Sequence, residues 1–183
     1  MLIAATRFNI YLTLLLALIG LGTGCQTVKT EIKKEPTSGL QFHLEVNPDG
    51  TDKNGPVTIN RATPFQVNIE RHPFLTEYQI AKAAVVDDAL GGFRMFVQFN
   101  RQGTWLLEQY TTAHKGKRIA IFSHFTGTEE NAKREGRWLA APVITRRVRE
   151  GDFTFTPDAR REEAETIATG LNNLAKKEQK HNP

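Results

Sequence analysis

Residues 82–100 read KAAVVDDALGGFRMFVQFN, and this stretch decides the fold. Its two arms, 82–87 and 93–100, are rich in β-branched and aromatic side chains and flank the turn-forming residues 88–92. Alternate side chains of a strand share a face, and one face of the second arm carries Phe93, Met95, Val97 and Phe99. The pattern predicts a β-hairpin whose second arm gives that face to the core.

Upstream of the hairpin, apolar residues recur with the period of two that is typical of half-buried strands. This period predicts short strands at 40–46, 57–59 and 65–69. Thr76 and Gln79 have the spacing of a capping box, in which the hydroxyl of the first residue meets the backbone N–H of the second. A short helix is therefore expected to begin at Thr76 and to end near Ala81.

Downstream of the hairpin, the spacing of Trp105, Leu106, Gln109 and Tyr110 predicts an amphipathic helix over 103–113. The polar residues 123–137, which include two glycines and several charges, predict an exposed loop. Strands are expected around that loop and near the end of the domain, at 119–121, at 138–148 with an interruption at Pro142, and at 153–155.

A closing helix is predicted from Thr156 as N-cap and Pro157 at the first helical position. Its apolar stripe consists of Ala164, Ile167, Ala168, Leu171 and Leu174. The expected order is strands, helix, hairpin, helix, strands, helix. This order favours the α+β class, with an antiparallel or mixed sheet and helices packed on one face.

The N-terminus has the layout of a secretion signal, with Arg7 before an apolar run at 10–21. A helix over that run would be roughly 18 Å long, well short of the ~30 Å hydrocarbon core of a bilayer. Thr23 and Gly24 stand directly before Cys25, which is the only cysteine of the chain. The arrangement resembles a bacterial lipobox, although Gly22 replaces the usual bulky aliphatic residue. We expect residues 1–24 to be removed and Cys25 to be lipidated; an ordinary signal peptide with an incidental cysteine is the alternative.

The remaining chain divides by composition. Residues 25–39 form a polar, lipidated tether that reaches at most about 45 Å. Residues 40–70 are expected to form an N-terminal β segment, 71–176 an α+β domain, and 177–183 a charged tail. The chain of 183 residues has a net charge of +4, and acidic residues are interleaved with the basic ones. Nucleic-acid binding requires clustering of one sign, so we expect no nucleic-acid partner.

Residues 75–174 resemble the head subdomain of the first periplasmic domain of the SecD/SecDF protein-export membrane proteins. The similar stretches are Leu75-Thr76 with Ile80 and Ala83; Gly92-Phe93; Gly103 with Leu107, Tyr110 and Thr111; Gly116 to Ile121; Ala141 to Ile144; and Phe155-Thr156 with Ala159, Ala164 and Ala168. Two features differ: the stretch 123–137 is longer than the family's hairpin, and Asn173 stands where the family has a glycine.

The resemblance implies a SecD head-like fold and a role on the periplasmic side of the bacterial cell envelope. The family's head is thought to receive exported, still unfolded polypeptide, which implies an apolar or edge-strand surface. Candidate polypeptide-binding residues are Phe96, Phe122 and Phe125, although each could instead be buried. The transmembrane carboxylates of the family's motor lie outside the similar region, so no motor activity is expected.

The sequence contains no convincing catalytic or metal-binding pattern. His43, His72, His114, His124 and His181 lack the close spacing of metal ligands. The pair Asp87-Asp88 fits turn chemistry better than acid–base chemistry, and neither a glycine elbow nor an orienting acid frames Ser123-His124. We therefore expect no catalytic residues, no metal, no cofactor and no enzymatic activity.

The leading hypothesis is a lipid-anchored envelope protein, in the inner or outer membrane, that binds exported or unfolded polypeptide and assists protein export. The alternative is a structural or scaffold lipoprotein that binds one fixed envelope protein. A third hypothesis is an enzyme that uses His124 together with the long loop.

Overall fold

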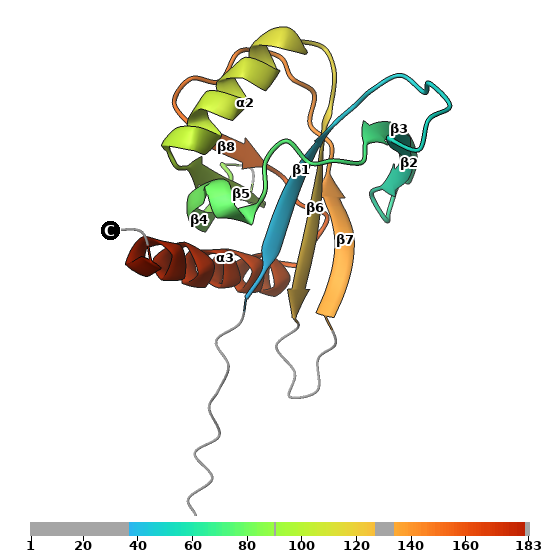
Figure 1. Ribbon diagram of the computed structural model, residues 1–183. Coiled ribbons are helices and arrows are strands. Elements are labelled where there is room, and N and C mark those ends of the chain that lie inside the picture. The colour runs from blue at the N-terminus through green and yellow to red at the C-terminus, as the bar shows by residue number, and fades with distance from the viewer. Residues whose placement is uncertain (1–36, 90, 127–133, 182–183) are drawn as a thin grey trace, which may run out of the picture. The chain divides into compact units, whose positions relative to one another are not determined.

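The computed structural model describes residues 37–89, 91–126 and 134–181. The strands are β1 (Gly39–Leu44), β2 (Asn54–Ile59), β3 (Phe65–Glu70), β4 (Ile80–Asp87), β5 (Phe93–Phe99), β6 (Ile119–Thr126), β7 (Arg134–Ala140) and β8 (Asp152–Phe155). The helices are the 3-10 helix η1 (Glu77–Gln79), α2 (Arg101–Ala113) and α3 (Arg161–His181). All strand pairs are antiparallel, in the sheets β1-β6-β7, β2-β3 and β4-β5-β8 (Figure 1). The fold is therefore α+β, as the sequence predicts, with the expected sheet divided into three.

The predicted hairpin is confirmed as β4 and β5, with β5 at the centre of its sheet. The N–H of Asp88 donates to the carbonyl of Gly92 at 2.9 Å, and Gly91 has a φ of 82°, which closes the turn. Met95, Val97 and Phe99 are buried, while Phe93 is half-buried. The alternating face of β5 thus enters the core, as its period of two indicates.

The core lies between the sheets β1-β6-β7 and β4-β5-β8. The ring of Phe42 on β1 meets the rings of Phe99 on β5 and Phe153 on β8 edge-on, at centroid distances of 5.3 Å and 5.9 Å. The buried stripe of α3 packs against β4 and also contacts β1 and β6. A single hydrophobic cluster therefore joins both sheets and the closing helix.

The prediction of an exposed loop over 123–137 is wrong at both ends of this range, where the structure has strands. β6 continues to Thr126, and β7 begins at Arg134, with Ser123 paired opposite Arg137. The strand tolerates Ser123 in the core because its Oγ donates to the carbonyl of Gly39 at 3.0 Å. Phe125 then continues the inward face of the strand. Residues 127–133, the remainder of the expected loop, lie outside the described residues.

The second face of β1 is also buried, so the strand is more enclosed than its half-buried pattern predicts. His43 is 5% exposed, its Nδ1 lies 2.9 Å from the carbonyl oxygen of Glu70, and its ring packs edge-on against Trp138. The β2-β3 hairpin contributes Ile59, Val67 and Ile69 to the cluster on this side. The segment 40–70 therefore shares a sheet and a core with the segment 71–176.

The two helices that flank the hairpin have different lengths from those expected. The Thr76–Gln79 capping box is present, but η1 is only one short turn. The chain changes to β4 at Ile80, because Ile80 pairs with Phe99 in the hairpin. The helix α2 begins two residues earlier than expected. Asn100 is its N-cap, and the side-chain oxygen of Asn100 accepts the N–H of Gly103 at 2.9 Å.

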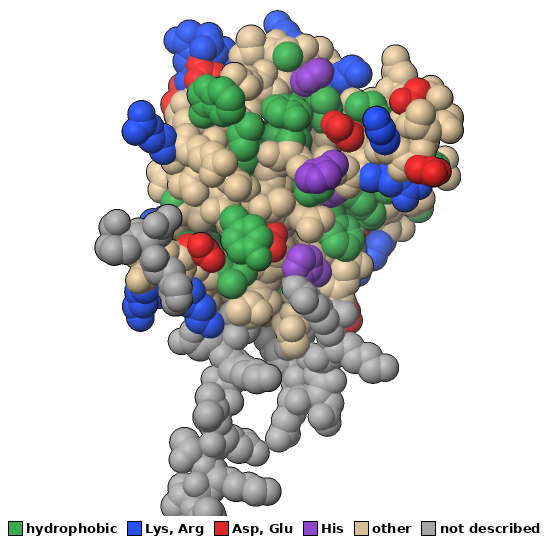
Figure 2. Space-filling view, viewed as in Figure 1, with side chains coloured by type: hydrophobic (Ala, Val, Ile, Leu, Met, Phe, Trp, Pro, Cys, Tyr) green, Lys and Arg blue, Asp and Glu red, His purple; other side chains and the backbone are tan. Residues whose placement is uncertain are grey.

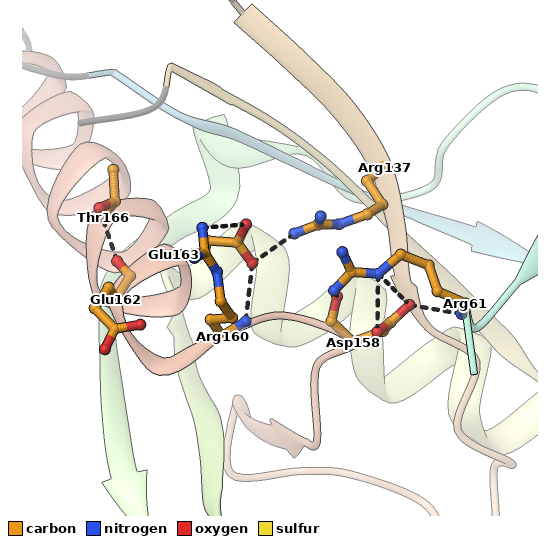
Figure 3. A network of polar contacts seen from close by, with 7 residues as sticks. All are labelled: Arg61, Arg137, Asp158, Arg160, Glu162, Glu163 and Thr166. Atoms are coloured by element: carbon orange, nitrogen blue, oxygen red, sulfur yellow. Dashed lines mark hydrogen bonds and ion pairs between the residues drawn. The ribbon is translucent and has the colours of Figure 1, made fainter. Parts of the chain in front are cut away.

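The predicted start of the closing helix at Thr156 and Pro157 is wrong, and α3 begins at Arg161. The segment 156–160 crosses the edge of β7 instead, where the N–H of Asp158 donates to the carbonyl of Leu139 at 2.7 Å. The carboxylate of Glu163 then accepts the N–H of Arg160 at 2.8 Å and caps the helix (Figure 3).

The expected strand over 138–148 is also shorter than predicted, because β7 ends at Ala140. Pro142 follows and has no N–H with which to continue the ladder. Beyond it the pairing is reduced to an isolated bridge between Val143 and Arg118 and to backbone bonds of Ile144 with Lys117 and Gly116. Residues 142–150 are therefore a connecting segment between β7 and β8. None of the helices in the described part of the chain is long and apolar enough to cross a membrane.

Candidate functional site

A hollow of the described surface lies beside the edge strand β8. It consists of two adjoining cavities of about 340 Å³ and 600 Å³, both of which are lined by Arg94, Pro142 and Thr154. One wall is β8 with the adjoining residues of β5, and the other is formed by the end of β7 and the residues that follow it, 139–146. We call this feature the β8 groove.

Some backbone N–H and C=O groups of β8 are not used in the ladder with β5. The N–H of Phe99 donates to the carbonyl of Gly151 at 2.9 Å, which places this pair in the ladder between β5 and β8. Ladder bonds recur at every second residue of an antiparallel pair, so Phe153 and Phe155 bond to β5. The N–H and C=O groups of Asp152 and Thr154 therefore point away from β5, at the open edge of β8.

The groove has apolar patches and balanced charges. Phe96 on the wall is half-buried, and Val143 on the opposite wall is 42% exposed. The charged residues that line the larger cavity are Arg94, Arg146, Glu150 and Asp152. The pKa of the Glu150 carboxyl is lowered by the backbone N–H groups of Glu150 and Arg149, which stabilise its charged form. Two positive and two negative side chains thus share the larger cavity, which favours a ligand of no strong net charge.

Phe122 lies elsewhere, on the face of β6 that points away from the main core. Its ring packs against Trp138 at a centroid distance of 5.1 Å and against His124 at 6.4 Å. Figure 2 shows hydrophobic and histidine side chains side by side on the face of the molecule that carries β1, β6 and β7. Phe96 and Phe122 therefore belong to different sheets, and only Phe96 lines the β8 groove.

Phe125 is part of the core. Its side chain is 3% exposed, and the guanidinium of Arg137 lies 5.5 Å from the ring centroid. Side chains on a strand alternate between faces, so Phe125 points opposite to Phe122. The ring of Phe125 is not accessible at the surface, and Cys25 lies outside the described residues.

The residues with potential chemistry are separated from one another. The described residues contain no group of three or more His, Cys, Asp or Glu side chains that could hold a metal ion. Ser123 is fully buried and bonded to Gly39, whereas His124 points to the other face of β6. Asp87 forms an ion pair with Arg161 of α3, and Asp88 closes the hairpin turn through its backbone. These residues therefore stabilise the fold and do not converge on a reaction centre.

The sequence prediction named Phe96, which lines the β8 groove, but named none of the other lining residues as binding candidates. The opposite wall comes from residues 142–146, which the sequence placed in a strand. The interruption at Pro142 was the available signal, since a proline limits how far a ladder can extend. Nothing local in the sequence indicates that this segment lies across from β8.

Comparison with known proteins places these features in a family. The family model described as SecDF, P1 head subdomain, matches residues 56–175, a range that contains the whole β8 groove. A protein translocase subunit SecD from Rhodothermus marinus is 27% identical over 145 residues, which cover 79% of this chain and 21% of that protein. The chain thus spans about a fifth of the length of this curated relative.

Two solved structures of SecDF share the fold. The first is described as a membrane component SecDF that enhances protein export, with a TM-score of 0.51 and 22% identity over 75% of this chain and 63% of that one. The second is SecDF in its Super-membrane-facing form, with a TM-score of 0.51 and 22% identity over 74% of this chain and 18% of that one. At this level of identity the likeness concerns the fold alone.

Proposed function

The chain belongs to the SecDF P1 head subdomain family, and from this membership we propose that it is a polypeptide-binding module of the bacterial cell envelope. In this proposal a lipid on Cys25 holds the protein on the periplasmic side of a membrane. The module binds exported, still unfolded chains and assists their export, and it has no motor activity of its own.

The observation that carries the proposal is the β8 groove. It combines three features around a cavity of about 600 Å³: the half-buried aromatic ring of Phe96, the exposed aliphatic side chain of Val143 and the open edge of β8. Apolar contacts and backbone hydrogen bonds are available in every polypeptide, whatever its sequence. A groove with these features and balanced charges suits many unfolded chains and does not require one fixed partner.

The lipid anchor is supported by the arrangement of residues before Cys25. A short apolar run, two small residues and a lone cysteine fit a lipoprotein signal, and two acyl chains give stable membrane attachment where one is marginal. Cells supplied with an alkyne-labelled fatty acid should incorporate the label into the wild-type protein. The Cys25→Ser variant should remain unlabelled, and a labelled Cys25→Ser variant would contradict the anchor.

Binding is tested with the full chain in detergent and a reduced, alkylated protein that stays unfolded. We expect binding to the unfolded form only, with an affinity that changes little between low and high salt because apolar and backbone contacts are not screened. Phe96→Ala should weaken this binding. Trp105→Ala is the matched control, because Trp105 is an exposed aromatic residue of α2 that does not line the groove.

The scaffold alternative predicts a different outcome. Crosslinking in the native envelope should then recover one stoichiometric partner, and purified unfolded protein should not bind. Equal binding by the wild-type protein and the Phe96→Ala variant would show that polypeptide binding does not depend on Phe96 in the β8 groove.

A further inference from the structure

We propose that the β8 groove takes an extended, uncharged polypeptide segment as an additional strand, hydrogen-bonded to the free edge of β8. This inference rests on the proposed function and specifies the mode of binding. Recognition is then carried mainly by the ligand's backbone, with its alternate side chains placed against Phe96 and Val143.

The two edges of the sheet β4-β5-β8 differ in whether their backbone N–H and C=O groups have hydrogen-bond partners. At the β4 edge, the side-chain amide of Asn172 on α3 accepts the N–H of Ala83 at 2.9 Å and donates to the carbonyl of Ala83 at 2.8 Å. This amide takes the place of a neighbouring strand and blocks that part of the edge. At the β8 edge, no described residue makes an equivalent pair of bonds to Thr154, which is half-buried in the groove wall.

An open edge strand is normally avoided, because its free N–H and C=O groups pair with other chains. Here the side chain of Asn172 closes part of one edge, whereas the other edge lies beside a partly open hollow. The opposite wall is already engaged, because the carbonyl of Leu139 on β7 accepts the N–H of Asp158. An incoming segment in the groove therefore finds its backbone partners on β8, at Asp152 and Thr154.

The dimensions and charges of the groove indicate the occupant. A cavity of about 600 Å³ lies within the range of binding sites that enclose several side chains, and the smaller cavity extends it along β8. The larger cavity contains two basic and two acidic side chains, so a segment of either net charge gains attraction from one pair and repulsion from the other. An extended segment with alternating apolar and small polar residues fits both properties.

The first experiment uses the wild-type full chain and leaves the protein unchanged. The probe is a short fluorescent peptide that alternates valine and serine, together with a series in which one backbone nitrogen at a time is methylated. In an added strand only every second N–H points toward its neighbour. We expect affinity to fall about fivefold or more at alternate positions and to remain almost unchanged between them, since one hydrogen bond contributes about 1 kcal/mol.

The second experiment changes the edge itself. Thr154→Pro removes the N–H that faces away from β5, whereas the ladder bonds to β5 are made by Phe153 and Phe155. Thr154→Val keeps the N–H and a side chain of the same shape, and serves as the control. Binding should be lost in the proline variant and kept in the valine variant, provided that circular dichroism and thermal melting show both to be folded.

Each outcome has a defined consequence. If the peptide binds but methylation shows no alternation, the groove recognises side chains only; the added strand is then rejected while the proposed function stands. If neither the peptide nor the unfolded protein binds, both proposals fail. The free chain could also form dimers that the Thr154→Pro substitution dissociates but that the peptide does not dissociate. The edge then serves self-association, and the inference is overturned.

Discussion

Asn172 of α3 bonds to both backbone polar groups of Ala83 on β4, with the N–H of Ala83 at 2.9 Å from its Oδ1 and the carbonyl at 2.8 Å from its Nδ2. Asn172→Ala should lower the free energy of unfolding by about 1–3 kcal/mol, because it leaves two partly buried groups without partners. Urea denaturation measures this loss. Thr169→Ala, at an exposed position of the same helix, should change stability by less than about 0.5 kcal/mol.

The Asn172→Ala variant should also associate, since its β4 edge is open. Light scattering should show larger species as the protein concentration rises, while the wild type and Thr169→Ala remain unchanged. An Asn172→Ala variant as stable and as dispersed as the wild type would show that the amide does not protect this edge.

Gly170 allows α3 to approach the start of β1 closely. A Cβ at this position would lie 2.3 Å from the Oγ of Ser38 and 2.6 Å from its backbone nitrogen. Gly170→Ala should therefore destabilise the protein by about 1–3 kcal/mol, although alanine favours a helix. Gly92→Ala is the control, because a Cβ there meets nothing within 4 Å. The two melting temperatures should differ clearly, and equal values would contradict the close packing.

His43 should make stability depend on pH. Burial is the largest influence on its pKa and lowers it; the carbonyl of Glu70 raises it in part, the charge of His72 lowers it again, and that of Glu70 raises it slightly. The unfolded chain therefore binds a proton more readily than the folded one. The stabilisation is complete above the ordinary value of 6.5 and is lost as the pH falls below it, toward the folded pKa.

The test compares urea denaturation at about pH 8 and about pH 5.5, where this linkage should lower the stability of the wild type. His43→Gln should reduce that difference, whereas His72→Gln, at an exposed position, should retain most of it. A wild-type stability that is constant over this interval would show that His43 is protonated in the folded state as easily as in the unfolded chain.

Glu163 links the start of α3 to β7 and provides a second pH dependence. Burial acts most strongly and raises its pKa, but the N–H of Arg160 and the charge and hydrogen bond of Arg137 together bring it below the ordinary value. Because the folded pKa is lowered, this stabilisation is present above the ordinary value of 4.5 and is lost as the pH falls through the folded pKa.

Glu163→Gln should cost about 1–3 kcal/mol at neutral pH, because Arg137 loses a charged partner at 3.0 Å in a mostly buried position. Glu165→Gln is the matched control. The carboxylate of Glu165 lies 3.9 Å from Arg161 and is more than half exposed, so its loss should cost less than about 0.5 kcal/mol. Chemical denaturation of both variants measures the difference.

Local patterns in the sequence predicted the elements that depend on neighbours in the chain. The β4-β5 hairpin and the capping box at Thr76 follow from residues a few positions apart, and both are present. The alternation of Ile119 and Ile121 continues through Ser123 and Phe125, but the polar composition of 123–137 concealed it. A buried serine was compatible with the strand only because Gly39, from the distant β1, supplies its acceptor.

The candidate site depended still more on distant contacts. The period of two placed Phe96 opposite the core face of β5, which is where the structure has it. The same period puts Phe122 and Phe125 on opposite faces of a strand, but only the sheet partners decide which face of β6 is covered. The open edge of β8 and the wall at 142–146 result from the packing of two sheets. Pro142 indicates where the strand ends, but nothing local indicates that the wall lies across from β8.

The antiparallel pairing of β1 with β6 has a consequence for how the chain is made. Ser123 Oγ and the carbonyl of Gly39 meet across 84 residues, so β1 leaves the ribosome long before its partner exists. At the usual pace of translation this delay is roughly 4 to 17 seconds, during which Leu40, Phe42 and Leu44 have no sheet to enter. The nascent chain therefore carries an apolar strand without its sheet partner until β6 is synthesised.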